Sequence, residues 1–194
     1  MLLDKKKVSM VTKVGAVIVS LTFIAYFIPF ITSIPETINN TNQQGQGQVQ
    51  VQQTLAALEQ AAQKNPKSAD AWVKLGNAYS DYAKSSNDSS ALSKAIDSYR
   101  KALELDPNNV NARVDMAIQY FYSGQVETAT AEARKAIEIN PNHALAYFNL
   151  AEFLRASGKS EEAIQAYEKY IELDPKGEGV KLAKDRIAVL KKQK

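Results

Sequence analysis

The sequence predicts an all-α fold in which helix–turn–helix units stack into a solenoid. Three Asp-Pro or Asn-Pro pairs recur at a step of 34 residues and close similar segments, KALELDPNN, KAIEINPNH and KYIELDPKG. The prolines of these pairs are Pro107, Pro141 and Pro175. A repeat of this length is typical of paired helices that need a neighbouring pair to bury their apolar face. Within the first unit Trp72, Leu75 and Tyr79 lie at helical spacing and form one stripe. Such a fold presents a surface, which argues against a protein built around a reaction.

Each repeat is expected to contain two helices joined by a turn. The repeats span residues 69–109, 110–143 and 144–177. Gly124 and Gly158 fall where the first helix of a repeat must end and reverse, since glycine adopts positive φ at little cost. The proline after each second helix ends that helix, because it disfavours helical geometry at the residue before it. Small residues stand where the two helices of a repeat approach most closely: Gly76, Ala117 and Ala151.

These residues resemble the tetratricopeptide repeat (TPR) family. The family pattern has Trp-x2-Leu-Gly-x2-Tyr on the first helix, then Ala, an aromatic residue and Ala on the second, then Pro. The first repeat matches with Trp72, Leu75, Gly76, Tyr79, Ala95, Tyr99, Ala102 and Pro107. The second matches with Met116, Ala117, Tyr120, Ala129, Ala133, Ala136 and Pro141, and the third with Tyr147, Leu150, Ala151, Leu154, Ala163, Tyr167 and Pro175. The resemblance covers residues 69–175.

Three features depart from the family pattern. Arg113 replaces the bulky apolar residue at the position of Trp72, which predicts a looser interface or an arginine stem lying along it. Tyr170 stands where the earlier repeats carry alanine, which predicts that the following segment is not an ordinary repeat. The first repeat is 41 residues long instead of 34. Its extra residues, 84–90 (KSSNDSS), are expected to lengthen the loop between its helices.

Both ends of the repeat domain, residues 51–194, are expected to be capping helices. Residues 51–64 form an amphipathic segment that ends at Asn65-Pro66, like the second half of a missing repeat. Residues 179–192 place apolar side chains on one stripe and basic ones largely elsewhere, as the last helix of a solenoid requires for solubility.

The N-terminal segment is predicted to be an uncleaved transmembrane signal anchor. Residues 14–35 carry no charge, and about 20 apolar residues suffice to cross a bilayer. Four lysines in residues 1–13, Lys5, Lys6, Lys7 and Lys13, precede the segment, so the positive-inside rule puts the N-terminus in the cytoplasm and the repeats on the other side. A cleaved signal peptide is the alternative, but the apolar run is longer than such peptides use and no small-x-small cleavage site follows it. The Asn-, Gln- and Gly-rich residues 36–50 are predicted to be a disordered linker.

No reaction chemistry is apparent in the sequence. His143 is the single histidine and the chain has no cysteine, so a four-ligand metal site is not expected. No glycine-rich phosphate loop follows a strand pattern. The net charge of +3 arises from residues 1–13, so the remaining chain is electrically balanced and lacks the basic field of nucleic-acid-binding proteins. We therefore expect neither an enzyme, a cofactor, a metal nor a nucleic-acid partner.

The resemblance to TPR proteins implies that the first helices line a concave face on which a ligand lies. The positions that face this groove in the family carry Asp70, Val73, Lys74, Asn77, Asp81, Asn111, Val114, Asp115, Ile118, Phe121, Tyr122, Leu145, Phe148, Asn149, Glu152 and Arg155. One TPR subclass binds a C-terminal carboxylate through lysines, asparagines and an arginine, and here only Asn77 matches that set. More prominent is an apolar, aromatic strip that the repeat core does not require, formed by Val73, Val114, Ile118, Phe121 and Phe148. Exposed apolar surface usually marks an interaction site. The partner-binding groove is thus predicted at Val73, Asn77, Val114, Ile118, Phe121, Tyr122, Leu145, Phe148 and Asn149. The alternative is that Phe121 and Tyr122 pack against the neighbouring helix.

The sequence favours a membrane-anchored TPR scaffold of bacterial type that binds a partner protein or peptide while an envelope complex is assembled. Two alternatives remain open at this point: a self-assembling structural TPR protein that forms homo-oligomers, and a chaperone of the cytochrome c maturation type.

Overall fold

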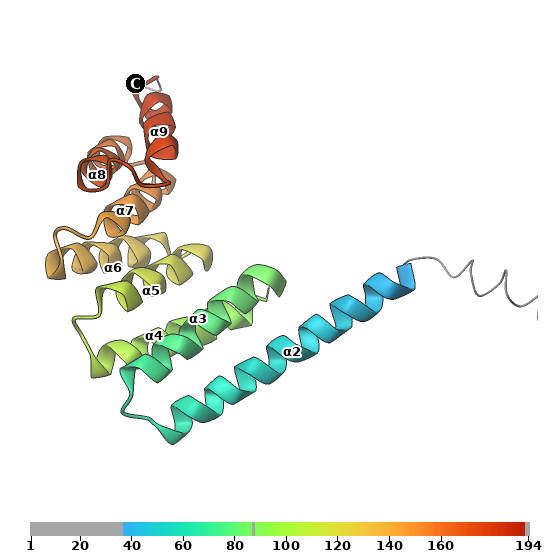
Figure 1. The fold of residues 1–194 in the computed structure, drawn as a ribbon. Helices are drawn as coiled ribbons and strands as arrows, with labels where there is room; N and C mark the ends of the chain where they lie inside the picture. Colours follow the sequence, from blue (N-terminus) through green and yellow to red (C-terminus); the bar gives the residue numbers. More distant parts are fainter. Residues whose placement is uncertain (1–36, 87, 193–194) are drawn as a thin grey trace, which may run out of the picture. The chain divides into compact units, whose positions relative to one another are not determined.

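The computed structural model describes residues 37–86 and 88–192, in which helices alternate with short turns (Figure 1). The helices in these residues are α2 (Thr37–Lys64), α3 (Ala69–Ser86), α4 (Ser89–Leu105), α5 (Val110–Tyr122), α6 (Val126–Ile139), α7 (Ala144–Ala156), α8 (Ser160–Leu173) and α9 (Val180–Lys192). The chain divides into two compact units, residues 1–50 and residues 51–194. The expected all-helical solenoid is confirmed in the second unit.

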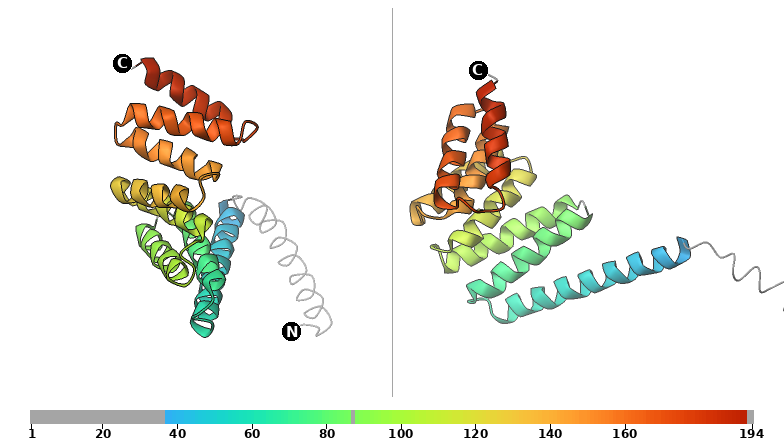
Figure 2. Two further views of the ribbon diagram at one scale, coloured as in Figure 1. Left: turned by 90° about the vertical axis from the view of Figure 1, so that its left-hand side faces the viewer. Right: turned by 45° about the horizontal axis from the view of Figure 1, so that its top comes forward.

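Within the second unit the helices pack in chain order, as Figures 1 and 2 show. The pairs α3–α4, α5–α6 and α7–α8 each form one repeat, and each pair packs against the next. The first helices also contact one another, α3 with α5 and α5 with α7, more closely than the second helices do. The first helices therefore lie on the inner, concave side of the curve. The last helix, α9, packs against α8 and ends the stack.

Each first helix begins with a side chain that caps its exposed backbone N–H groups. The cap residues are Ser68, Asn109 and His143, and each accepts a hydrogen bond from the backbone N–H three residues later, at 3.0 to 3.2 Å. Such caps satisfy donors that the first turn of a helix leaves free. Because these residues stand at the same place in each repeat, all three first helices start in the same register.

The turns also follow the sequence pattern. Gly124 and Gly158 have φ values of 81° and 73°, in the left-handed region that favours glycine. The residues before the prolines, among them Asp106 and Asn140, have φ near −135° and ψ of 84° and 93°. This extended geometry is what a following proline imposes, and it ends α4 and α6.

Close approach of the two helices in the first repeat depends on Gly76. A Cβ atom at this position would lie 2.7 Å from the ring of Tyr99 on α4, which is fully buried. Ala117 and Ala151 take the same place in the next repeats and are also fully buried. The small residues therefore allow the contact that the sequence predicted for them.

Tyr170 is buried and holds the start of the capping helix. Its hydroxyl accepts a hydrogen bond from the backbone N–H of Gly179 at 3.1 Å, and its ring meets Phe148 edge to face at 5.1 Å. The large side chain therefore fills the place where the earlier repeats receive another first helix. This arrangement agrees with the expectation that α9 does not begin an ordinary repeat.

The seven extra residues of the first repeat lengthen its helices, and this differs from the expected longer loop. Helix α3 has 18 residues, whereas α5 and α7 have 13 each; α4 has 17 residues, whereas α6 and α8 have 14 each. The hydroxyls of Ser85 and Ser86 donate to the carbonyl of Tyr82 at 3.0 and 2.7 Å. These serines bond back to the helix and so remain helical.

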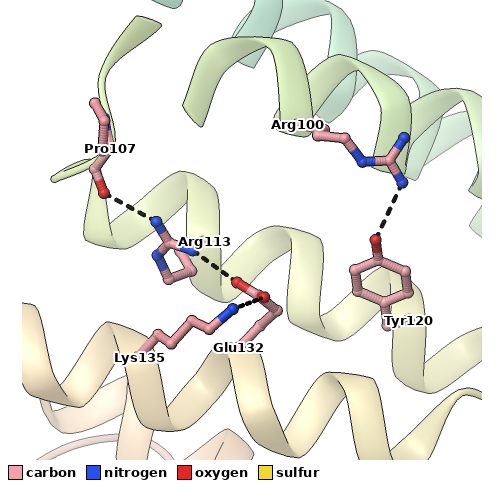
Figure 3. A network of polar contacts seen from close by, with 6 residues as sticks. All are labelled: Arg100, Pro107, Arg113, Tyr120, Glu132 and Lys135. Carbon is pink, nitrogen blue, oxygen red and sulfur yellow. Dashed lines mark hydrogen bonds and ion pairs between the residues drawn. The ribbon is translucent and has the colours of Figure 1, made fainter. Parts of the chain in front are cut away.

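The interface at Arg113 is held by polar contacts, so it is not the looser interface that was one expectation (Figure 3). Its guanidinium donates to Glu132 on α6 at 2.7 Å and to the carbonyl of Pro107 at 3.0 Å. Lys135 also pairs with Glu132, at 2.8 Å. The side chains of Arg113 and Glu132 are only 14% and 13% exposed, so this network lies within the packed interface.

The N-terminal predictions are only partly covered by the described residues. Residues 37–50 are helical and continue into residues 51–64 as one helix, which corrects the expected disordered linker over 36–50. The segment holds five glutamines, which are good helix formers, and no proline after Pro35, so it can extend the capping helix. Among residues 37–86 and 88–192, no helix has the length and apolar character needed to cross a membrane. The predicted anchor, residues 14–35, and the basic residues 1–13 lie outside the described residues.

Candidate partner-binding face

Two large apolar side chains of the concave helices are exposed. Tyr122, the last residue of α5, is 61% exposed, and Leu145, in the first turn of α7, is 57% exposed. Both belong to the predicted groove. Their positions at helix ends explain their exposure, because the neighbouring first helices cover the middle of the face more fully than its edges.

Other predicted groove residues belong to the core. Val114 is only 5% exposed and packs with Ala136 on α6 and Ala146 on α7, so it is not available to a partner. Val73 and Ile118 are half-buried and pack against core clusters. The prediction placed these residues on the exposed strip from their position in the repeat, and close packing of adjacent repeats has covered them.

The two phenylalanines of the strip pack inside the solenoid. The ring of Phe121 stacks on Phe153 of α7, with ring centroids 4.9 Å apart. Phe148 meets Tyr167 and Tyr170 edge to face at 5.9 and 5.1 Å. The packing alternative therefore holds for Phe121, whereas Tyr122 extends into solvent.

The two predicted asparagines are already hydrogen-bonded within the domain. The Oδ1 atom of Asn77 accepts from the hydroxyl of Tyr99 at 2.7 Å. The Nδ2 atom of Asn149 donates to the carbonyl of Leu145, one turn earlier, at 2.8 Å. Asn77 is exposed and Asn149 half-buried, so both could still offer their remaining polar atoms to a ligand.

The concave helices also carry an acidic pair, Asp81 on α3 and Asp115 on α5. Burial raises the pKa of Asp115, and the charge of Asp81 adds to this, while Lys84 and His143 act in the opposite direction. Lys84 pairs with Asp81 at 3.3 Å. Within the described part of the chain, the carboxylate of Asp115 has no ion-pair partner. The same two carboxylates help to raise the pKa of the Tyr99 hydroxyl, after burial.

The opposite end of the concave face has a more balanced network centred on Glu152 of α7. Arg155 pairs with its carboxylate at 2.7 Å, Arg186 of α9 approaches it at 3.6 Å, and the hydroxyl of Tyr167 donates to it. Burial alone would raise the pKa of Glu152, but these hydrogen bonds and positive charges outweigh it and lower the pKa. Two guanidiniums thus face one carboxylate here, whereas one ammonium, that of Lys84, lies near the two carboxylates of Asp81 and Asp115.

The longer helices of the first repeat create a cavity of about 460 Å³ beside Tyr122. We call this cavity the insertion pocket. It is lined by Ala83, Lys84, Asp88, Ser89, Leu92 and Tyr122. The sign of this pocket in the sequence was the extra length of the first repeat, which was expected to form only a longer loop.

His143 has a structural role. Its Nδ1 atom accepts from the N–H of Ala146 at 3.1 Å, so its Nε2 atom carries the proton and donates to Oδ1 of Asn111 at 2.9 Å. Across residues 37–86 and 88–192, no group of three or more His, Cys, Asp or Glu side chains could hold a metal ion.

Family models match two parts of the sequence. The model described as Tetratricopeptide repeat matches residues 132–165, and the model described as Tetratricopeptide Repeats-Sensor matches residues 34–125. The peroxisomal targeting signal receptors of Komagataella phaffii and Komagataella pastoris are each 40% identical to this chain over 75 residues. These matches cover 39% of this chain and only 12% of each receptor.

Solved structures show the same architecture. MamA superposes with a TM-score of 0.66 at 23% identity, over 77% of this chain and 82% of MamA, which shows the shared fold alone. The Sgt2 TPR domain from Aspergillus fumigatus has a TM-score of 0.57 at 30% identity, over 64% of this chain and 78% of that one. The first TPR domain of Spaghetti (RPAP3), bound to the HSP90 peptide SRMEEVD, has a TM-score of 0.57 at 26% identity. The match covers 64% of this chain and 91% of that domain's chain. The helices from α3 onward therefore form a solenoid of tetratricopeptide repeats, a protein–protein interaction domain similar to peptide-binding TPR domains.

Proposed function

We propose that this protein is a membrane-anchored TPR adaptor of a bacterial envelope, whose concave face binds a segment of a partner protein during assembly of a larger complex. The observation that carries this proposal is the exposure of Tyr122 and Leu145 on the concave helices. Large apolar side chains that the repeat core does not use are costly to leave in water, and such surface usually marks an interaction site.

The comparisons support peptide binding as the mode of interaction. The Spaghetti domain, which resembles this chain in fold, is bound to a seven-residue peptide. The relatives that share 40% identity over 75 residues are named as receptors of a targeting signal. An extended or helical segment lying along α3, α5 and α7 is accordingly the ligand we assign to this domain.

The proposed binding face can be tested by photo-crosslinking in cells. A photoreactive benzoyl-phenylalanine is placed at Tyr122 in the full-length protein, and a second protein carries it at Gln165, an exposed residue of α8 on the outer side. We expect Tyr122 to capture one dominant partner that Gln165 does not capture. Equal capture from both positions, or none from Tyr122, would contradict the assignment of the concave face.

The proposed membrane anchor is residues 14–35, with residues 1–13 in the cytoplasm and the repeats on the other side. The apolar run and the lysines before it support this topology. Because the chain has no cysteine, a single cysteine introduced at Gln165 reports on it directly. We expect a membrane-impermeant maleimide to label Gln165→Cys in cells whose outer barrier has been opened while the inner membrane is intact. Labelling that requires lysis of the inner membrane would overturn the proposed topology.

Self-assembly is a second candidate, favoured by the outer surface of α9. Leu182 and Val189 are 43% and 51% exposed and lie seven residues apart, on one face of the helix that ends the solenoid. A second copy could cover this face. Sedimentation of the full chain in detergent, over a range of concentrations, would then show dimers or larger species that Val189→Lys abolishes.

A further inference from the structure

The insertion pocket exists because the first repeat is longer than the others. Helices α3 and α4 each extend beyond the length of their counterparts in the later repeats, whereas α5 ends at Tyr122. The extended helix ends and the exposed ring of Tyr122 border this space, which is open to solvent on one side. No equivalent lengthening occurs in the second or third repeat, so the feature distinguishes the α3 end of the concave face.

The lining of the pocket fits an apolar side chain. Ala83, Leu92 and Tyr122 supply apolar walls, and the cavity of about 460 Å³ has room for a leucine or an aromatic ring. Two of the three polar side chains in the lining, Asp88 and Lys84, already have partners within the protein. Asp88 accepts from the backbone N–H of Ser90 at 2.8 Å as the cap of α4, and Lys84 pairs with Asp81. A polar ligand group would have to displace these contacts, whereas an apolar one would not.

Negative charge lies next to this apolar pocket. Asp115 and Tyr122 are seven residues apart on α5 and so occupy the same helix face. Lys84 connects the two regions, because it lines the pocket, pairs with Asp81 and is close enough to Asp115 for its charge to act on that carboxylate. One ammonium thus faces two carboxylates, which leaves this part of the face with an excess of negative charge.

We propose that the insertion pocket holds a leucine or an aromatic side chain of the partner segment, and that a lysine or arginine close to it in the same segment lies against Asp81 and Asp115. This proposal rests on the proposed function, since it specifies the ligand of the same concave face. Charge complementarity decides between ligand classes here. An acidic segment such as the peptide SRMEEVD, which the Spaghetti domain binds, would bring its carboxylates against Asp115.

The specificity can be determined without knowing the partner. A displayed library of random 12-residue peptides is panned against the full-length chain, purified in a mild detergent. We expect the enriched peptides to share a leucine or aromatic residue within a few positions of a lysine or arginine. Enrichment of acidic peptides, or of apolar peptides without a basic residue, would overturn the proposal.

The affinity of one enriched peptide for variants then locates its binding site. Tyr122→Ala and Asp115→Asn are each expected to weaken binding about tenfold, the effect of losing one well-placed contact. Asp185→Asn, which removes the same charge from the exposed side of α9, is the matched control and should leave the affinity unchanged. The effect of Asp115→Asn should shrink as salt is raised, because screening weakens charge interactions.

A third variant separates failure of this proposal from failure of the proposed function. Leu145→Ala alters the concave face outside the pocket. If Leu145→Ala weakens binding while Tyr122→Ala and Asp115→Asn do not, the concave face binds the peptide but the pocket and acidic pair are not its site. If none of the three variants weakens binding, or no peptide is enriched at all, both proposals fail together.

Discussion

Arg113 on α5 and Glu132 on α6 form a largely buried ion pair that replaces an aromatic contact of the first repeat. In the first repeat the indole N–H of Trp72 donates to the carbonyl of Pro66 at 3.0 Å. The guanidinium of Arg113 donates to the carbonyl of Pro107, the same position one repeat later, also at 3.0 Å. Its other terminal nitrogen pairs with Glu132 at 2.7 Å. Arginine thus keeps the donor function of the tryptophan and adds a charge that needs a partner.

The partner is present only in this repeat. Ser98 and Ala166 stand at the positions that correspond to Glu132 in the first and third repeats. Lys101, one repeat before Lys135, lies over the ring of Trp72 at 4.2 Å, whereas Lys135 pairs with Glu132. Arg113 at the position of Trp72 and Glu132 at the position of Ser98 therefore compensate for each other, because a buried guanidinium without a carboxylate would be costly.

Removal of the carboxylate should destabilise the protein more than removal of both charged groups. We expect Glu132→Ala to lower the free energy of unfolding by about 2 kcal/mol, since it leaves a largely buried guanidinium with a single carbonyl partner. The double change Arg113→Trp with Glu132→Ser recreates the pair found in the first repeat and should recover most of this loss. Urea unfolding followed by circular dichroism measures both. Equal destabilisation by the single and double variants would show that the pair is not coupled.

Acid should weaken the same contact. Hydrogen bonds from Lys135 and Arg113 lower the pKa of Glu132, although burial alone would raise it. A carboxyl group whose pKa is lower in the folded state stabilises the fold above its unfolded pKa, about 4.3, and this stabilisation is lost as the pH falls through the folded value. Urea midpoints measured from pH 7 to pH 3 should therefore fall less steeply in Glu132→Gln than in the unaltered protein. Glu104→Gln, on an exposed part of α4, is the matched control.

Local signals in the sequence predicted most of the fold. Helices α3, α5 and α7 begin at residues 69, 110 and 144, where the predicted repeats start. This agreement has a simple cause, because a proline or a left-handed glycine acts on the backbone at its own position and needs no distant contact. The insertion at 84–90 could not be predicted in the same way. Serine, asparagine and aspartate suit a loop and a helix end equally well, so only the bonds from Ser85 and Ser86 back to Tyr82 show that α3 continues.

The binding face depended on distant contacts and was less predictable. Repeat position alone placed Val114 on the groove, but the approach of α6 and α7 buries it. Tyr122 and Leu145, which the prediction placed in the groove but not on its apolar strip, are the exposed apolar residues, and both stand at helix ends. The charged groups that act on Asp115 come from α3 and from the turn before α7, so no pattern within α5 could predict the raised pKa of this carboxyl group.

Phe121 and Tyr122 are adjacent in the sequence but should respond differently to substitution. Phe121→Ala removes the ring stacked on Phe153 and is expected to cost about 2 kcal/mol of stability, less than a fully buried phenylalanine because Phe121 is only partly buried. Tyr122→Ala should change stability by no more than about 0.5 kcal/mol, as most exposed positions do. Thermal unfolding of the two variants measures the difference. A larger loss from Tyr122→Ala would mean that its ring packs within the domain and is not free for a partner.

Asp115→Asn should make the fold more stable, although we expect it to weaken binding. Burial raises the pKa of Asp115 and the charge of Asp81 adds to this, against the opposing charge of Lys84, so the ionised carboxylate is held at a cost. A carboxyl group whose pKa is raised in the folded state lowers the free energy of unfolding, and this loss is complete only above the folded pKa. The loss disappears as the pH falls below the unfolded pKa of about 3.9. The urea midpoint of Asp115→Asn should therefore exceed that of the unaltered protein at pH 7 and equal it near pH 3. Asp185→Asn should show no difference at either pH. If Asp115→Asn is instead less stable at pH 7, the carboxylate is satisfied by contacts within the fold, and it would then be a structural group with no charge left to offer a partner.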